Sequence, residues 1–166
     1  MKRYVELFRI PNVWVLLIAC FPARVAYGMV GLSIFFKAEQ STGSIAFAGI
    51  AIGLNAAAGS FTAGIRGSIM DKYGQTWPLR IMVPAYAAMA FALNAMHSKP
   101  LMLIFAFVMG LSAPPINLSV RPLWKIVVPP DFLRTAYAMD TAIMSAAGVV
   151  GPVIATSLAL SSHPSL

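Results

Sequence analysis

Long apolar blocks are the feature of this sequence that most constrains its fold. Each block is close to the length that a helix needs to cross the hydrocarbon core of a bilayer, about 20 residues at about 1.5 Å per residue. Lipid offers no hydrogen-bond partner for open backbone groups, so each block is expected to be helical. We place about five spans, at residues 12–36, 45–70, 78–96, 101–120 and 136–160. The sequence therefore predicts an all-α, polytopic membrane helix bundle.

Composition supports a membrane location and argues against a nucleic-acid partner. Hydrophobic residues make up 59% of the chain and charged residues 10%, whereas soluble chains carry about 25% charged residues. The net charge of +7 comes from basic residues that flank apolar blocks, rather than from one dense basic stripe with interleaved aromatic residues. The expected partner of the helices is the lipid bilayer.

The distribution of lysine and arginine predicts the orientation of the chain. Of the 12 such residues, nine fall on one side of the predicted spans, two on the other, and Arg24 lies within the first span. Cytoplasmic loops carry the excess of basic residues. The N-terminus is therefore expected in the cytoplasm of a multi-pass cell membrane protein. The nine are Lys2, Arg3, Arg9, Arg66, Lys72, Arg80, Arg121, Lys125 and Arg134, and the two are Lys37 and Lys99.

A glycine-bounded motif lies between the second and third predicted spans. It has Gly67, three residues, then Asp71, Lys72, one residue and Gly74. Gly67 would permit close helix contact, and Gly74 would supply a turn. The pattern and its position resemble motif A of the major facilitator superfamily of transporters. That family often has two basic residues after the second glycine, where this chain has Gln75 and Thr76.

The resemblance implies a fold and a gating role. Residues 1–166 would be an incomplete N-terminal domain of a longer transporter, and Asp71 with Lys72 would help to close its cytoplasmic side against a missing C-terminal half. Gly151 and Pro152 in the last predicted span resemble a degenerate motif C, which bends this helix in many exporters. The stretch from Arg134 to Asp140 is similar to a bacterial branch of the superfamily.

Four residues are candidates for binding a small-molecule substrate. Arg24 lies near the middle of the first span, where a charged side chain costs about 2.5–3.5 kcal/mol on insertion scales. It should face the bundle interior and find an anion, either a side chain or a substrate. Tyr27, Asn55 and Asn117 lie on helices that line the cavity in the resembled family. A structural role is the alternative for each, since membrane asparagine often bonds a neighbouring helix.

Asp140 near the start of the last span has two interpretations. It would couple to protons, or it would pair with a cation near the same boundary such as Arg121 or Arg134. We favour the structural interpretation, because an acidic residue in the first turn of a helix also complements the helix dipole.

Rows of small residues at four-residue spacing predict close helix packing. One row is Gly49, Gly53 and Ala57, and the other is Ala147, Gly151 and Ala155.

Enzyme, cofactor and metal chemistry are not expected. The sequence has no phosphate-binding glycine loop, no Gly-x-Ser-x-Gly elbow and no paired histidines with a helical glutamate. Cys20 stands alone, which rules out an internal disulfide, and nothing near His97 or His163 suggests a metal site.

The function predicted from these features is secondary active transport of a small solute by alternating access, as part of a longer transporter. We expect the chain to be a fragment or truncated form. The alternatives are a small membrane protein that self-assembles and a scaffold-type subunit without transport activity.

Overall fold

The computed structural model describes residues 2–162, and these residues form helices and connecting turns without any strand. The all-α prediction is confirmed. The elements in chain order are α1 (Lys2–Arg9), α2 (Val13–Thr42), α3 (Ile45–Tyr73), α4 (Thr76–Ala95), α5 (Lys99–Ser112), α6 (Ile116–Val127), the 3₁₀ helix η1 (Pro130–Phe132) and α7 (Leu133–Ser162).

Among residues 2–162, four segments are long and apolar enough to cross a membrane. They are Val13–Thr42, Ile45–Tyr73, Lys99–Val127 and Pro130–Ser161. α4 occupies the place of the remaining predicted span, but it carries Arg80 and Asn94 and is not among the four. A helical membrane bundle is thus supported, and the crossing by α4 stays a prediction.

The predicted span 101–120 is not one continuous helix. α5 ends at Ser112, and α6 begins at Ile116. Proline lacks the backbone N–H that a helix interior needs, and it forces the residue before it out of the helical region. Ala113, which precedes Pro114, accordingly has a ψ of 121°. The two consecutive prolines therefore interrupt the helix within this block, and Lys99–Val127 as a whole is still long and apolar enough to cross a membrane.

Local sequence explains where α3 begins and ends. Gly43 has a φ of 66°, and the hydroxyl of Ser44 then accepts a hydrogen bond from the backbone N–H of Phe47. At the other end, Gly74 has a φ of 73°, a conformation that side chains make costly. The turn predicted at Gly74 is therefore confirmed.

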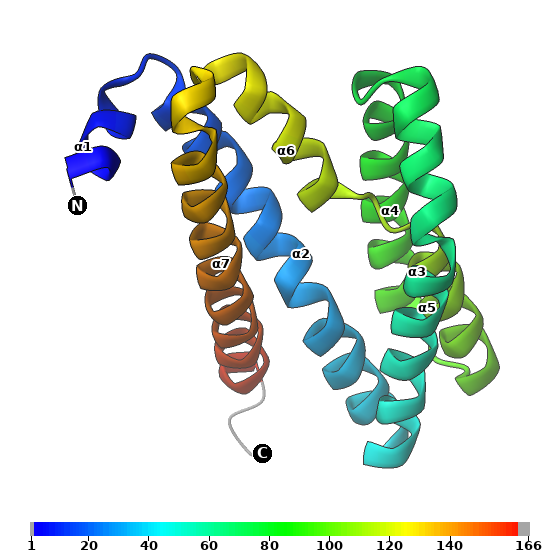
Figure 1. The fold of residues 1–166 in the computed structure, drawn as a ribbon. Helices are drawn as coiled ribbons and strands as arrows, with labels where there is room; N and C mark the ends of the chain where they lie inside the picture. The colour runs from blue at the N-terminus through cyan, green and yellow to red at the C-terminus, as the bar shows by residue number, and fades with distance from the viewer. Residues whose placement is uncertain (1, 163–166) are drawn as a thin grey trace. The chain divides into compact units, whose positions relative to one another are not determined.

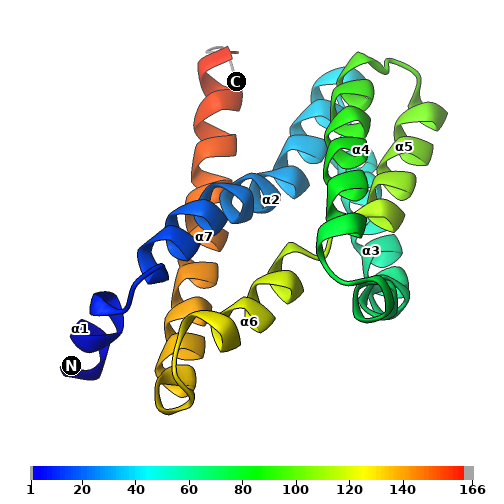
Figure 2. The ribbon, with the colours of Figure 1, turned by 90° about the horizontal axis from the view of Figure 1, so that it is seen from above.

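The chain divides into two compact units. The terminal unit comprises Met1–Met29 and Ile116–Leu166, and the central unit is Val30–Pro115. In the terminal unit, α6 and α7 lie side by side, and the first part of α2 crosses α7 (Figures 1 and 2). Its apolar core is made of Leu7, Val13, Leu17, Val120, Trp124, Val128 and Ala136.

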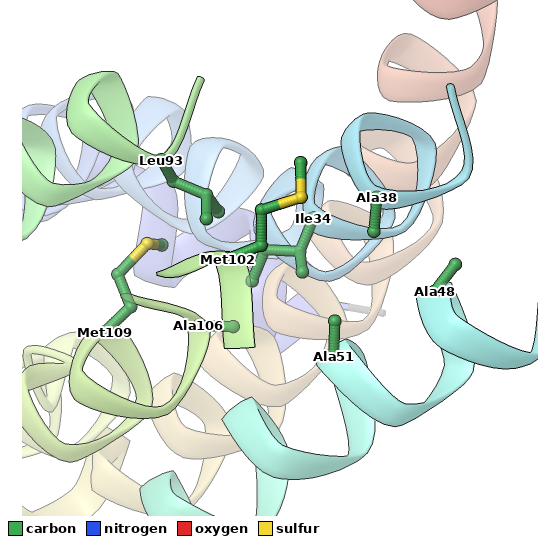
Figure 3. Close-up of a cluster of buried hydrophobic side chains, with 8 residues drawn as sticks. All are labelled: Ile34, Ala38, Ala48, Ala51, Leu93, Met102, Ala106 and Met109. Carbon is green, nitrogen blue, oxygen red and sulfur yellow. The ribbon is translucent and has the colours of Figure 1, made fainter. Parts of the chain in front are cut away.

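The central unit packs α3, α4 and α5 side by side (Figures 1 and 2). Figure 3 shows its core, in which methionine side chains of α5 meet small and aliphatic residues of the other helices. The core consists of Ile34, Ala38, Ala48, Ala51, Leu93, Met102, Ala106 and Met109. Methionine fills irregular gaps well because it is unbranched and flexible.

Candidate functional site

A buried ion pair joins α2 and α7 within the terminal unit. Nη2 of Arg24 donates to Oδ1 of Asp140 at 2.7 Å, and Nη1 donates to the backbone carbonyl of Asp140 at 3.4 Å. The side chains of Arg24 and Asp140 are only 2% and 5% exposed. Nε of Arg24 is buried and has no hydrogen-bond partner among the described residues.

This ion pair identifies the anion that Arg24 was expected to meet and the cation that pairs with Asp140. Arg24 was expected to meet an anion, and the structure supplies a side chain, Asp140. For Asp140 the alternatives were coupling to protons or pairing with a cation such as Arg121 or Arg134. The structure pairs Asp140 with Arg24, and both other arginines are exposed at the surface. Burial decides between the partners: an exposed arginine can be solvated by water, whereas Arg24 in an apolar helix depends on the carboxylate.

A close helix crossing lies beside this ion pair. A Cβ added at Gly151 of α7 would lie 2.8 Å from the carbonyl oxygen of Val25, and a Cβ at Gly28 of α2 would lie 3.2 Å from the carbonyl oxygen of Ala147. The packing predicted for the Ala147 row is thus present. Pro152, inside α7, directly follows the crossing.

The second row of small residues does not pack within its unit. Among the residues described there, nothing lies within 4 Å of a Cβ at Gly49 or Gly53. The closest approach of α3 to α5 instead places Gly110 against the backbone of Asn55 and the side chain of Ala58. Helical phase explains the difference, since Asn55 and Ala58 lie three residues apart on a different face of α3.

The other substrate-binding candidates are not gathered with Arg24. Nδ2 of Asn55 donates to the carbonyl oxygen of Ala106 at 2.8 Å in the central unit, which matches the structural alternative. Asn117 lies in the terminal unit, and its Oδ1 is buried without a partner among the described residues. Tyr27, three residues after Arg24, is 37% exposed. The substrate-binding roles of all four residues stay predictions.

The motif A residues lie at the exposed end of α3. Asp71 and Lys72 are both exposed, and Nζ of Lys72 stands 5.3 Å from the centroid of the Tyr73 ring. Within the described central unit, nothing lies within 4 Å of a Cβ added at Gly67, so its predicted close contact is absent there. The gating role of Asp71 stays a prediction.

Sequence reasoning missed the role of Arg66, which it only counted among the basic residues on the cytoplasmic side of the predicted spans. The side chain is buried in the central unit and donates hydrogen bonds to the backbone carbonyls of Gly59, Gly110 and Ala113. Two of these carbonyls belong to the last turn and cap of α5, where helix carbonyls lack their usual donors. The signal was available, because Pro114 and Pro115 end α5 and Arg66 lies inside the predicted span 45–70.

The described residues do not form a recognisable metal site. Across residues 2–162, no group of three or more His, Cys, Asp or Glu side chains is placed to hold a metal ion. His97 is exposed, and His163 lies outside the described residues.

The fold and the ion pair define a multi-pass helical membrane protein with a buried polar site between two of its helices. The chain is similar to an uncharacterized transporter of the major facilitator superfamily type, y4rN of Sinorhizobium fredii (strain NBRC 101917 / NGR234), with 30% identity over 166 residues. This similarity covers 93% of the chain, but only 40% of the length of the relative. It confirms the resemblance that motif A indicates. No family model matches the chain, and no solved structure matches it.

Proposed function

We propose that this chain forms part of a secondary transporter that moves a small solute by alternating access, with Arg24 and Asp140 in its solute site. The observation that carries the proposal is the ion pair itself, which is buried between two helices that are long and apolar enough to span a membrane. The similarity to a transporter over 93% of the chain supports transport as the general activity.

The ion pair has the chemistry that a solute site needs. Ionisable residues are rare in membrane helices and typically mark pathways for substrates, ions or protons. Arg24 holds Asp140 through one side-chain bond and one longer bond to the backbone. A solute that carries a carboxylate or another hydrogen-bond acceptor would compete with Asp140 for the same guanidinium donors. Binding of the solute would then release the carboxylate of Asp140 from Arg24. The site would therefore have two arrangements, one with Arg24 paired to Asp140 and one with Arg24 paired to the solute.

Further parts of the mechanism rest on the same proposal. The excess of basic residues supports a cytoplasmic N-terminus, and Asp71 with Lys72 would gate that side. The rocking of two halves around a midplane site requires helices beyond these. The chain spans about 40% of the length of its relative, and a C-terminal half would provide the remaining helices.

The thiol of Cys20 provides a test that requires no knowledge of the substrate. Cys20 lies four residues before Arg24 on α2, so both fall on one face of the helix, and its side chain is half-buried. In right-side-out and inverted membrane vesicles, a membrane-impermeant maleimide should label Cys20 from both sides. A permeant maleimide measures the total reactive thiol, and Cys20→Ser is the blank.

Labelling from one side only, with full labelling by the permeant reagent, would contradict alternating access. The same labelling measurement on the variant Asp140→Asn tests the role of the ion pair. Weakening the ion pair should change the ratio of labelling between the two sides if the pair belongs to the moving site. An unchanged ratio would remove Asp140 from the solute site and leave it a structural partner of Arg24.

Self-assembly remains the second candidate, and one observation favours it. The row Gly49, Gly53 and Ala57 is exposed within the central unit, and such rows let another membrane helix approach closely. A stable oligomer of the chain in mild detergent, lost on Gly53→Leu, would support this function. A mass of one chain for both the unmodified protein and Gly53→Leu would rule out self-assembly.

A further inference from the structure

A cavity of about 620 Å³ opens at the turn between α3 and α4 in the central unit. This volume falls in the range of small-molecule sites, about 300–1,000 Å³. The lining is mainly apolar, with one charged side chain in its wall. Residues that matter for the argument are Ile65, Arg66, Ile69, Tyr73, Trp77 and Ile81.

We propose that this cavity binds one anionic phospholipid, with an acyl chain against the isoleucines and the phosphate group beside Lys72. The ammonium group of Lys72 stands over Tyr73, which lines the cavity, so a cation lies at its rim. Arg66 lines the cavity and Lys72 stands at its rim, whereas none of the residues that line the cavity is acidic. This charge balance favours an anion.

The shape of the lining favours a lipid over a soluble anion. Ile65 is 59% exposed, Ile81 is 55% exposed and Trp77 is 69% exposed, so the cavity is open at an apolar surface. Trp and Tyr are enriched where a membrane protein meets the lipid headgroups, because their rings are apolar and carry one polar atom. An apolar groove with aromatic and basic residues at one end matches the two ends of a phospholipid.

Arg66 acts on this site from within the protein. Its guanidinium is bonded to three backbone carbonyls, so it holds α3 against the end of α5 without a neutralising carboxylate. The carbonyl dipoles stabilise this charge but do not neutralise it, so the cavity wall keeps a net positive charge. That charge adds to the attraction of Lys72 for a headgroup phosphate.

Native mass spectrometry of the full chain in mild detergent tests the proposal. Equimolar palmitoyl-oleoyl phosphatidylglycerol and phosphatidylcholine are added, and retention of each by the protein is measured. One phosphatidylglycerol should be retained in preference to phosphatidylcholine. Lys72→Gln should weaken its retention about fivefold, from the attraction expected for one basic residue near an anionic headgroup. Lys99→Gln is the matched control, because Lys99 is equally an exposed lysine of the central unit.

A second variant tests the cavity rather than the charge. Ile81→Trp adds bulk at an exposed lining position, and it should abolish the retained lipid while an unchanged circular dichroism spectrum shows intact helices. Equal retention of the two lipids, or full retention in Ile81→Trp, would overturn the proposal. A dimer that Ile81→Trp converts to monomer, without any retained lipid, would show instead that a second copy covers the cavity.

Discussion

Both units bury an arginine, and they compensate its charge in different ways. In the terminal unit, Arg24 meets the carboxylate of Asp140, an opposite full charge on another helix. In the central unit, Arg66 meets the carbonyl dipoles of Gly59, Gly110 and Ala113. Among the described residues, both side chains are less than a tenth exposed, so neither can rely on water.

The difference separates a site that can exchange partners from one that holds structure. An ion pair is made by two independent side chains, and another anion can replace the carboxylate. Backbone carbonyls cannot leave, because they belong to the helices that the arginine joins. Arg66 also completes hydrogen bonding at the end of a helix that Pro114 and Pro115 cut short. We therefore expect Arg24 to serve the solute site and Arg66 to serve stability.

The largest expected effect comes from removing the carboxylate of the ion pair. Asp140→Ala leaves Arg24 buried without its counter-charge, and breaking such a pair costs about 3–5 kcal/mol. The free energy of unfolding in detergent, measured by circular dichroism during titration with sodium dodecyl sulfate, should fall by that amount.

A double variant is the control for this loss. Arg24→Met with Asp140→Leu removes both charges, and a buried pair replaced by apolar residues is often neutral in stability. The double variant should therefore be clearly more stable than Asp140→Ala. If the two are equally unstable, the ion pair is not what Asp140 contributes.

The second prediction concerns the glycine crossings that hold each arginine near its acceptors. Gly151→Ala places a Cβ against the carbonyl of Val25, and Gly110→Ala places one against the backbone of Asn55. Overpacking of this kind costs about 1–3 kcal/mol. Both variants should unfold at lower temperature, measured by tryptophan fluorescence during heating.

Neighbouring glycines in open space provide the controls. A Cβ at Gly148 of α7 or at Gly53 of α3 meets nothing within 4 Å in the described structure. Replacing these helical glycines by alanine should stabilise by about 0.5–1 kcal/mol, because glycine is the more flexible residue in the unfolded chain. Destabilisation by Gly53→Ala would mean that its face of α3 is covered by another helix.

Sequence reasoning located the helices well because apolar length and glycine or proline breaks are local signals. The turn at Gly74 followed from a single residue type. The partner of Asp140 could not be predicted in this way. Choosing Arg24 over Arg121 or Arg134 requires knowing that α2 crosses α7 at Gly28 and Gly151. The spacing of small residues suggests that a crossing exists, but it does not state which helix lies opposite.

Arg66 shows a different limit of sequence reasoning. A basic residue near the end of a predicted span is normally counted with the adjoining loop, because long basic side chains reach the membrane interface. The acceptors of Arg66 are backbone carbonyls, which carry no sequence signal of their own. Only the double proline after α5 indicates that unpaired carbonyls exist. The sequence does not indicate that a residue 47 positions earlier donates a hydrogen bond to the carbonyl of Ala113.

Exchange of arginine for lysine should separate the two kinds of compensation. Lysine is a compact point charge, whereas arginine offers a planar fork of donors. Arg24→Lys can retain an ion pair with Asp140, but Arg66→Lys loses the planar fork of donors that serves three carbonyls on two helices. We expect Arg66→Lys to lose about 1–2 kcal/mol, the cost of a buried carbonyl left unpaired.

The measurement is the free energy of unfolding of both lysine variants in one detergent. Arg24→Lys should be the more stable of the two. If Arg24→Lys is instead the weaker variant, then the bond from Arg24 to the backbone carbonyl of Asp140 matters as much as the charge.

The smallest expected effect tests the neutral counterpart of Arg66. Asn55 also bonds a backbone carbonyl of α5, that of Ala106, but it carries no charge. Asn55→Ala should cost about 1 kcal/mol, as expected for a single net hydrogen bond. Asn94→Ala on α4 is the control, because Asn94 is exposed. The midpoint of thermal unfolding of this variant should stay unchanged. A larger loss for Asn55 than for Arg66→Lys would show that the mid-helix contact, and not the arginine at the end of α5, holds α3 and α5 together.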